Sequence, residues 1–406
     1  MATYIEKGTL KSIALGAFGA GIAFSTKGQI ALVVIGISIL CHLVYTRKWE
    51  RLLNWKLLVA LVVFGLTIAP MLYAYYHQFD LHPEKVIRGK DNRSGIFFIF
   101  WEQSFERMSG EGVGKNSSDF FFFFHTFLWV FLPWTVLALI GYWTKIKAFW
   151  EAKFAYRPNL EFLTVGGISI LFLLISFAQF KLPHYMNILM PLYSILSAAF
   201  LFALYQNHKL KMAKVILGVQ YFILGLVVVF ALLVSFYVFK LEHWYSYLLL
   251  LIALGLVSYL IIQKETPYTK IVTVGILSSV LLNGLMNAHF YPKLLDYQGG
   301  SNMAEKIQEK NIPVDNIYKV SERYSWSLDF YNKNPVNIVS VTELKNFKDV
   351  WVYATDEELN QLKKNGIAWD NQITVDQFRI TRLQAKFLNP NTREDKLNKM
   401  HLVHLD

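Results

Sequence analysis

The stretch that decides the fold class runs from residue 214 to residue 239 and reads KVILGVQYFILGLVVVFALLVSFYVF. After its opening lysine it contains no acidic or basic side chain. A helix of about 20 apolar residues is long enough to cross the ~30 Å hydrocarbon core of a bilayer. The stretch therefore predicts a membrane-spanning helix.

The rest of the chain has the same character. Apolar residue types make up 54% of the 406 residues and charged types only 17%, whereas an average soluble domain has about 25% charged residues. We therefore predict a polytopic α-helical membrane protein. Its nine expected spans lie near 8–24, 27–46, 56–75, 119–142, 162–180, 185–205, 214–239, 245–262 and 270–290.

The formal net charge of +11 is unevenly distributed. From Pro292 to Asp406 the 16 basic and 16 acidic residues balance, so the excess lies among the apolar runs. Positive loops between spans are typical of the cytoplasmic side, which argues against nucleic acid as a partner. The pattern predicts that the N-terminus lies inside and the C-terminus outside the cytoplasm, and the expected location is a bacterial inner (plasma) membrane. The charges lie in alternate connections: Arg47, Lys48, Arg51, Lys56, Lys145, Lys147, Lys153, Arg157, Lys209, Lys211, Lys214, Lys264 and Lys270.

Two outside segments are long. Residues 1–291 are expected to form the transmembrane domain, with an outside loop at 76–118 whose residues 96–108 form a helix at the membrane surface. Residues 292–406 are expected to form a small soluble α/β domain outside the cytoplasm. Its predicted strands are 317–320, 336–340 and 350–354, and a capped helix follows from Thr355 to Gly366. We interpret the domain as a structural cap, with an acceptor-binding lid as the alternative.

Charged and hydroxyl side chains gather at the predicted outer membrane face. A lipid phosphate held at this depth needs cationic or hydroxyl donors, because negative charge builds on the departing phosphate oxygen during sugar transfer. Charge at membrane depth is costly and tends to mark function. Pro183 is expected to fix the turn of the third group. The candidates are Lys27, then Glu102, Glu106 and Arg107, then Lys181, His184 and Tyr185.

Each candidate also has an ordinary structural explanation. Lys27 and Lys181 are able to snorkel to the interface, and Arg107 is able to pair with an acid on its own helix. His184 fits a plain loop histidine, and Tyr185 fits an aromatic-belt anchor. Only their occurrence together at one face favours a lipid-phosphate site.

Three motifs resemble the GT-C glycosyltransferase superfamily, in the branch of aminoarabinose transferases and protein O-mannosyltransferases. They are GIAFSTKG (21–28), WEQSFER (101–107) with an aromatic span ending in LPW (132–134), and KLPHY (181–185) followed by Pro191. The resemblance covers residues 1 to about 300. Relatives place a histidine at Ser104 and an acid at Gln103, and this departure puts a metal or proton-transfer role of that helix in doubt.

The resemblance implies site residues. Arg107 and Tyr185 match positions that bind the carrier phosphate, and Lys27 matches a motif lysine. Family members begin with further spans and an outside loop whose acidic pair supplies the catalytic base. That loop has no counterpart at the start of this chain. The expectation is therefore a truncated, mis-started or split gene product, inactive or nearly so alone, with Glu102 or Glu106 as stand-in bases.

The predicted function is transfer of a sugar from a polyprenyl-phosphate donor to a lipid, glycan or protein acceptor of the cell envelope. One alternative is a non-catalytic subunit that binds lipid phosphate. Another is a transporter or flippase of lipid-linked sugars, which the location of the charges at one face rather than the midplane disfavours. No metal-binding motif is present, and assistance by a divalent metal is left open.

Overall fold

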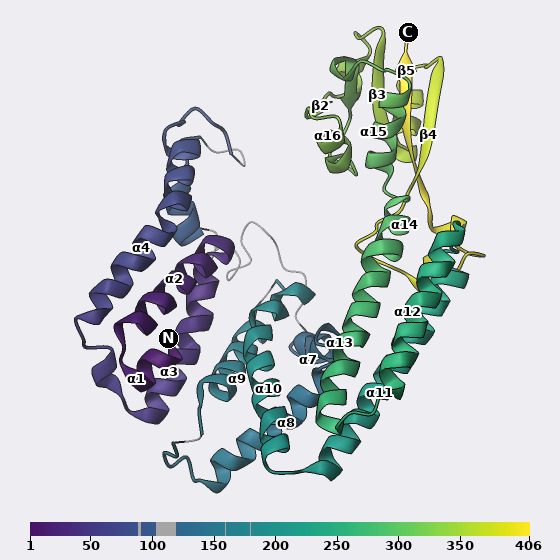
Figure 1. Ribbon diagram of the computed structural model, residues 1–406. Helices are drawn as coiled ribbons and strands as arrows, with labels where there is room; N and C mark the ends of the chain where they lie inside the picture. Colours follow the sequence, from purple (N-terminus) through teal and green to yellow (C-terminus); the bar gives the residue numbers. More distant parts are fainter. Residues whose placement is uncertain (88–90, 103–118, 159, 179) are drawn as a thin grey trace. The chain divides into compact units, whose positions relative to one another are not determined.

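A computed structural model describes residues 1–87, 91–102, 119–158, 160–178 and 180–406 (Figure 1). The chain forms two compact units. The first comprises Met1–Tyr221 and Glu265–Gly275, and the second comprises Phe222–Lys264 and Ile276–Asp406. Within the described residues, five helical stretches are long and apolar enough to cross a membrane: Gln29–Thr46, Lys56–Asp80, Leu210–Val238, Trp244–Ile262 and Pro267–Leu295.

The first unit opens with four helices. They are α1 (Ala2–Lys7), α2 (Leu10–Lys27), α3 (Gln29–Thr46) and α4 (Lys56–Tyr75), which continues as η2 (Tyr76–Asp80). Gly28, with φ of 67°, is the only residue between α2 and α3. At Gly21 of α2 an added Cβ would lie 2.6 Å from the Cβ of Thr67, so the glycine allows α4 to approach closely. The short connection η1 (Trp49–Arg51) precedes α4.

The expected span 119–142 is not one helix, and this prediction is wrong. α7 (Phe122–Val130) ends before Pro133, and α8 (Thr135–Glu151) starts after it. Proline has no N–H to donate to the preceding turn and breaks a helix interior. α8 then runs past the expected end of the span, so Lys145 and Lys147 lie on a helix rather than in a loop.

The remaining membrane helices of the first unit are α9 (Leu163–Ser176) and α10 (Met190–Gln206), which are apolar but shorter than the five above. The 3₁₀ helix η4 (Pro183–Ile188) connects them. Their core with α7 combines aliphatic side chains with several aromatic rings. Phe127 stacks on Tyr193 with ring centroids 4.2 Å apart, and Phe124 meets the edge of Phe172 at 4.7 Å.

The second unit contains parts of two long helices and all of α12 (Trp244–Ile262). α11 (Leu210–Leu233) continues into η5 (Val234–Val238), and α13 (Pro267–Leu285) continues into η6 (Met286–Phe290) and α14 (Tyr291–Leu295). The prediction of a polytopic helical membrane protein is confirmed, while the count of nine spans and the 291/292 domain boundary stay predictions.

The C-terminal α/β domain is also confirmed. Its five-stranded sheet has the order β2-β1-β3-β5-β4, with β1, β2 and β3 parallel and β5 antiparallel to both neighbours. The strands are β1 (Ile317–Lys319), β2 (Asn337–Ile338), β3 (Val350–Thr355), β4 (Asn371–Gln377) and β5 (Asn398–Leu405). The helices are α15 (Gly299–Glu309), η7 (Val314–Asn316), α16 (Trp326–Tyr331), α17 (Val341–Leu344), α18 (Asp356–Lys364), α19 (Ala385–Leu388) and η8 (Glu394–Lys396).

The three predicted strands and the capped helix are present. Thr355 and Glu358 form the reciprocal capping box of α18, and Gly366 follows its end with φ of 77°. Strands β4 and β5 were not predicted. Separate apolar clusters cover the two faces of the sheet, one around Met303 and Leu328 and the other around Leu359 and Leu362.

Arg393 joins the α/β domain to the end of α11. Its guanidinium donates to the carbonyl oxygens of Val238 and Phe387 at 2.5 and 3.0 Å, and to the Tyr297 hydroxyl at 3.1 Å. It also lies 4.7 Å above the ring of Phe239. Charge-assisted bonds of this kind are roughly twice as strong as neutral ones.

Candidate functional site

The first candidate group lies where α2 ends. Lys27 is the last residue of α2 and its side chain is exposed. One turn earlier, Phe24 is buried and packs against Phe100 of η3 (Phe98–Glu102), with centroids 5.4 Å apart. The end of α2 and the segment carrying Glu102 are thus neighbours.

Asp80 anchors the start of that segment. Its carboxylate accepts hydrogen bonds from the Ser94 hydroxyl at 2.5 Å and from the N–H groups of Gly95 and Ile96 at 2.9 and 3.4 Å. Free N–H groups at a helix start are satisfied by such acceptors. Asp80 therefore has a structural role at the beginning of α5 (Gly95–Phe97), which precedes η3.

Glu102 is paired with an arginine that the sequence analysis did not assign to it. Its Oε2 lies 3.2 Å from a terminal nitrogen of Arg93. This ion pair gives Glu102 a charged partner within the same segment. The other members of this group, Glu106 and Arg107, lie outside the described residues, as do Gln103 and Ser104.

The second group follows α9. Lys181 is only 3% exposed, which is rare for a lysine. Pro183 occupies the first turn of η4, and the N–H of Tyr185 donates to the carbonyl oxygen of Leu182 at 3.0 Å. Pro183 thus begins the turn as predicted. The segment places Lys181 immediately before a rigid, hydrogen-bonded turn.

His184 and Tyr185 have different surroundings. The His184 side chain is exposed, and its ring meets the Tyr185 ring edge-on with centroids 5.0 Å apart. Tyr185 is half-buried against the apolar cluster that includes Met186 and residues of α7 and α9. The fold therefore packs Tyr185 of the KLPHY motif against the cluster that includes α7, the aromatic helix that follows the WEQSFER motif in the sequence.

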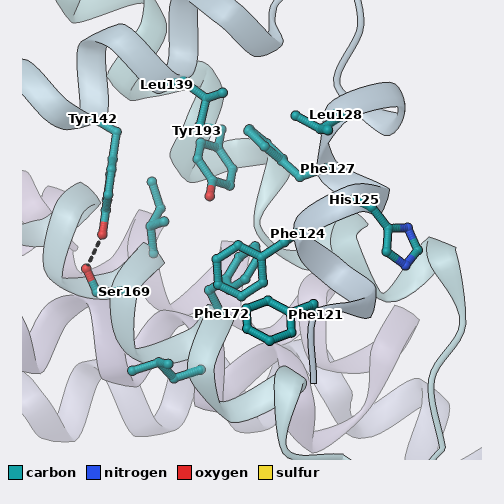
Figure 2. A pocket seen from close by; sticks show the side chains of 12 residues that line it. Phe121, Phe124, His125, Phe127, Leu128, Leu139, Tyr142, Ser169, Phe172 and Tyr193 are labelled. Carbon is teal, nitrogen blue, oxygen red and sulfur yellow. Dashed lines mark hydrogen bonds between the residues drawn. The ribbon is translucent and has the colours of Figure 1, made fainter. Parts of the chain in front are cut away.

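An apolar cavity of about 610 Å³ opens beside this helix. Figure 2 shows Phe121, Phe124 and Phe172 along one part of its wall, with the hydroxyl of Tyr193 pointing inward. Tyr142 and Ser169 are hydrogen-bonded to each other at 2.6 Å, so they present no free pair of polar groups. The sequence analysis missed this cavity, because its lining comes from four helices: α7, α8, α9 and α10.

Polar groups near the cavity are few. His125 lies at its edge, with Nε2 3.6 Å from a carboxylate oxygen of Asp119. Among the residues that the structure describes, no three histidine, cysteine, aspartate or glutamate side chains are placed to hold a metal ion. A role for a divalent metal stays untested.

Outside the membrane helices, the clearest electrostatic feature is His404 of β5. It lies between Asp370, 2.7 Å from Nδ1, and Asp349, 3.1 Å from Nε2. The Asp370 carboxylate, with Asp349, raises the pKa of His404 above 6.5, and His404 lowers the pKa of Asp370. This triad stabilises the end of the sheet, and nothing links it to the candidate phosphate site.

Comparison with curated proteins finds a relative in the branch that the three motifs resemble. No protein-family model matches the chain. Over 276 residues, 64% of the chain, it is 26% identical to the undecaprenyl phosphate-alpha-4-amino-4-deoxy-L-arabinose arabinosyl transferase 2 of Proteus mirabilis (strain HI4320). The match covers 44% of that protein, so this chain corresponds to less than half of its length.

Comparison with solved structures finds a similar fold in the same kind of protein. The chain is similar to ArnT from Cupriavidus metallidurans bound to undecaprenyl phosphate (TM-score 0.59, 15% identity) and in the apo state (TM-score 0.58, 16% identity). Each comparison covers 96% of this chain and 68% of the other. The predicted resemblance is thereby confirmed at the level of the fold: this is an integral membrane chain with an ArnT-like fold.

Proposed function

We propose that the chain serves a glycosyltransferase reaction in which a sugar leaves a polyprenyl-phosphate donor for a lipid, glycan or protein acceptor. The observation that carries this proposal is the buried Lys181, immediately before the hydrogen-bonded turn that contains Tyr185 and connects two apolar helices. The ArnT protein of similar fold is bound to undecaprenyl phosphate in its solved structure, which supports a lipid phosphate as the ligand of this chain.

The chemistry asks for cations at the leaving group. When the acceptor attacks the anomeric carbon, the bond from that carbon to the phosphate oxygen breaks, and negative charge develops on the phosphate. An ammonium group in a site shielded from water stabilises that charge more than it would in bulk solvent. We assign this role to Lys181, with the Tyr185 hydroxyl as a second donor and Lys27 and Arg107 as further cations.

The apolar cavity fits the carrier's hydrocarbon chain. Its walls are almost wholly aromatic and aliphatic, and it lies against the helix on which η4 packs. Apolar pockets with few polar groups suit apolar ligands. We therefore propose that isoprene units occupy the cavity while the phosphate lies at the Lys181 turn.

Binding of undecaprenyl phosphate to the purified full chain tests the site. Lys181→Met is expected to weaken binding about ten- to hundredfold, since a hydrogen bond to a charged group contributes about 1.5–3 kcal/mol. Tyr185→Phe is expected to weaken it less, because the ring still packs. The matched control is Lys209→Met, an exposed lysine near the other end of α10. Equal affinity for the parent, Lys181→Met and Tyr185→Phe would refute the assignment.

The pairing of Glu102 with Arg93 favours a second function, a subunit that binds lipid phosphate without catalysis. The discriminating assay follows sugar release from a polyprenyl-phosphate sugar by the parent chain and by Glu102→Gln. Turnover abolished by Glu102→Gln but retained by Asp80→Asn would make Glu102 the base. Binding without turnover would support the second function.

A further inference from the structure

An aromatic patch on the α/β domain has no role in the proposed reaction. It consists of Tyr324, Trp326, Phe330 and Tyr331, which are 39%, 80%, 76% and 50% exposed. Large apolar side chains grouped on the surface of a soluble domain usually mark an interaction site. Trp326 and Phe330 are four residues apart on α16 and so lie on the same face of that helix.

The sheet register places Tyr324, Trp326 and the start of α16 at the end of the domain nearest the membrane helices. Gly299 begins α15 shortly after α14, the last turn of the apolar stretch Pro267–Leu295. Its N–H donates to the Gln377 side chain at 2.7 Å, and an added Cβ would lie 3.0 Å from Met400. Met400 pairs with Thr355. The C-terminal ends of β3 and β4 therefore face α14.

Strand β1 is parallel to β3, so its C-terminal residue Lys319 lies at the same end. The chain leaves β1 there and continues into the patch. Contact with α15 confirms the position, because a Cβ added at Gly300 would lie 2.9 Å from both the Tyr324 carbonyl oxygen and the Leu328 nitrogen. In Figure 1 the C-terminus lies at the opposite end of this domain from α14.

Hydrogen bonds from the buried Lys319 fix the segment that carries the patch. The ammonium group of Lys319, 2% exposed, donates to Asp329 at 2.7 Å, Ser325 at 3.1 Å and Glu322 at 3.3 Å. Asp329 lies on α16 between Trp326 and Phe330 in sequence, and also accepts from the Val336 N–H at 2.8 Å. Trp326, Phe330 and Tyr331 thus project from a helix that buried hydrogen bonds hold in place.

We propose that this aromatic patch inserts into the headgroup region of the bilayer that the chain's own helices span. Tryptophan and tyrosine are enriched at that depth because their rings are apolar and their polar atoms remain hydrated. The nearby charges favour a neutral surface: Arg323 is paired with Glu357 at 2.7 Å, and Glu322 contacts Lys319. A zwitterionic lipid is therefore sufficient, and the contact orients the domain on the membrane.

The test uses the full chain in phosphatidylcholine proteoliposomes, with Cys41 replaced by serine and a single new cysteine carrying an environment-sensitive fluorophore. Trp326→Cys and Phe330→Cys are the reporting positions. Asn371→Cys is the matched control, because Asn371 is exposed and pairs with His404 at the far end of the sheet. Lipids with a nitroxide near the headgroup act as quenchers.

Insertion to a depth of about 5–10 Å predicts blue-shifted emission and strong quenching at positions 326 and 330, with neither at position 371. Quenching at 326 and 330 no greater than at 371 would overturn the proposal. A blue shift without quenching, lost when the protein is diluted in the membrane, would assign the patch to contact with a second copy of the chain instead. A blue shift that requires an added glycolipid would assign the patch to binding of an acceptor. Because Trp326→Cys and Phe330→Cys are tested separately, misfolding caused by one substitution does not account for a result that both variants share.

Discussion

Buried charges in this chain have partners that the local sequence does not reveal. Lys319 uses all three of its donors on Glu322, Ser325 and Asp329, and it closes the end of the sheet beneath α16. Removing one partner of a buried pair leaves the other charge uncompensated, which costs far more than an exposed pair contributes.

Lys319→Met is therefore expected to lower the free energy of unfolding of the α/β domain by about 3 kcal/mol. Urea unfolding followed by circular dichroism measures the change on residues 296–406. Lys333→Met serves as the control, because that lysine is exposed in the same region. A loss equal to that of the control would show that the Lys319 pairs do not stabilise the domain.

His404 makes the stability of the same domain depend on pH. Its folded-state pKa is raised above 6.5 by Asp370 and Asp349, so the folded state binds the proton more tightly than the unfolded chain. The contribution is complete below pH 6.5 and is lost as pH rises through the folded pKa. Unfolding midpoints at about pH 6 and about pH 8 should therefore fall with pH. His404→Gln should abolish that part of the slope, and an unchanged slope would contradict the prediction.

At the scale of elements, both faces of the sheet have cores made within the domain. One cluster joins α15 and α16 to the sheet and the other joins α18 to it. By contrast, Phe378 and Phe387 complete a cluster with Val234 and Phe239 at the end of α11. The sheet is thus self-sufficient, whereas the 378–397 segment depends on the membrane helices.

Residues 296–406 expressed alone are expected to fold and to unfold cooperatively. The segment around Phe387 should then be exposed, and limited proteolysis should cleave it faster than in the full chain. A disordered far-ultraviolet spectrum with no cooperative melt would contradict the first expectation. Equal cleavage rates in both forms would contradict the second.

At the scale of the whole molecule, the positive loops predict a C-terminus outside the cytoplasm. With Cys41 replaced by serine, an introduced cysteine at Asn334 should react with an impermeant reagent in intact cells. A cysteine at Lys209 should react only after permeabilisation, because its loop is predicted to be cytoplasmic. Labelling of position 209 in intact cells would reverse the topology. Asn334 and Lys209 are both exposed in the structure, so protein burial does not limit the reaction.

The sequence by itself determined the class of fold, because hydrophobic runs and caps are local signals. A run such as 214–239 is stable only in lipid or a large core, and the Thr355 capping box specifies a helix start from four consecutive residues. The resemblance of three short motifs was also sufficient to recognise the ArnT-like fold, which the similarity to solved structures confirmed. The position of Lys27 at the end of α2, and that of Lys181 in the connection between α9 and α10, followed from the same runs.

Only the tertiary structure decided what depends on distant partners. The pairing of Glu102 with Arg93, the anchoring role of Asp80 and the burial of Lys181 depend on contacts or packing that the hydropathy pattern does not encode. Strand β4 carries only two apolar residues, Ile373 and Val375, and its place in the sheet depends on pairing with β5, which also pairs with β3. Likewise, four helices had to assemble before an apolar cavity existed. Such features arise from packing energy between segments, which periodicity along one segment does not contain.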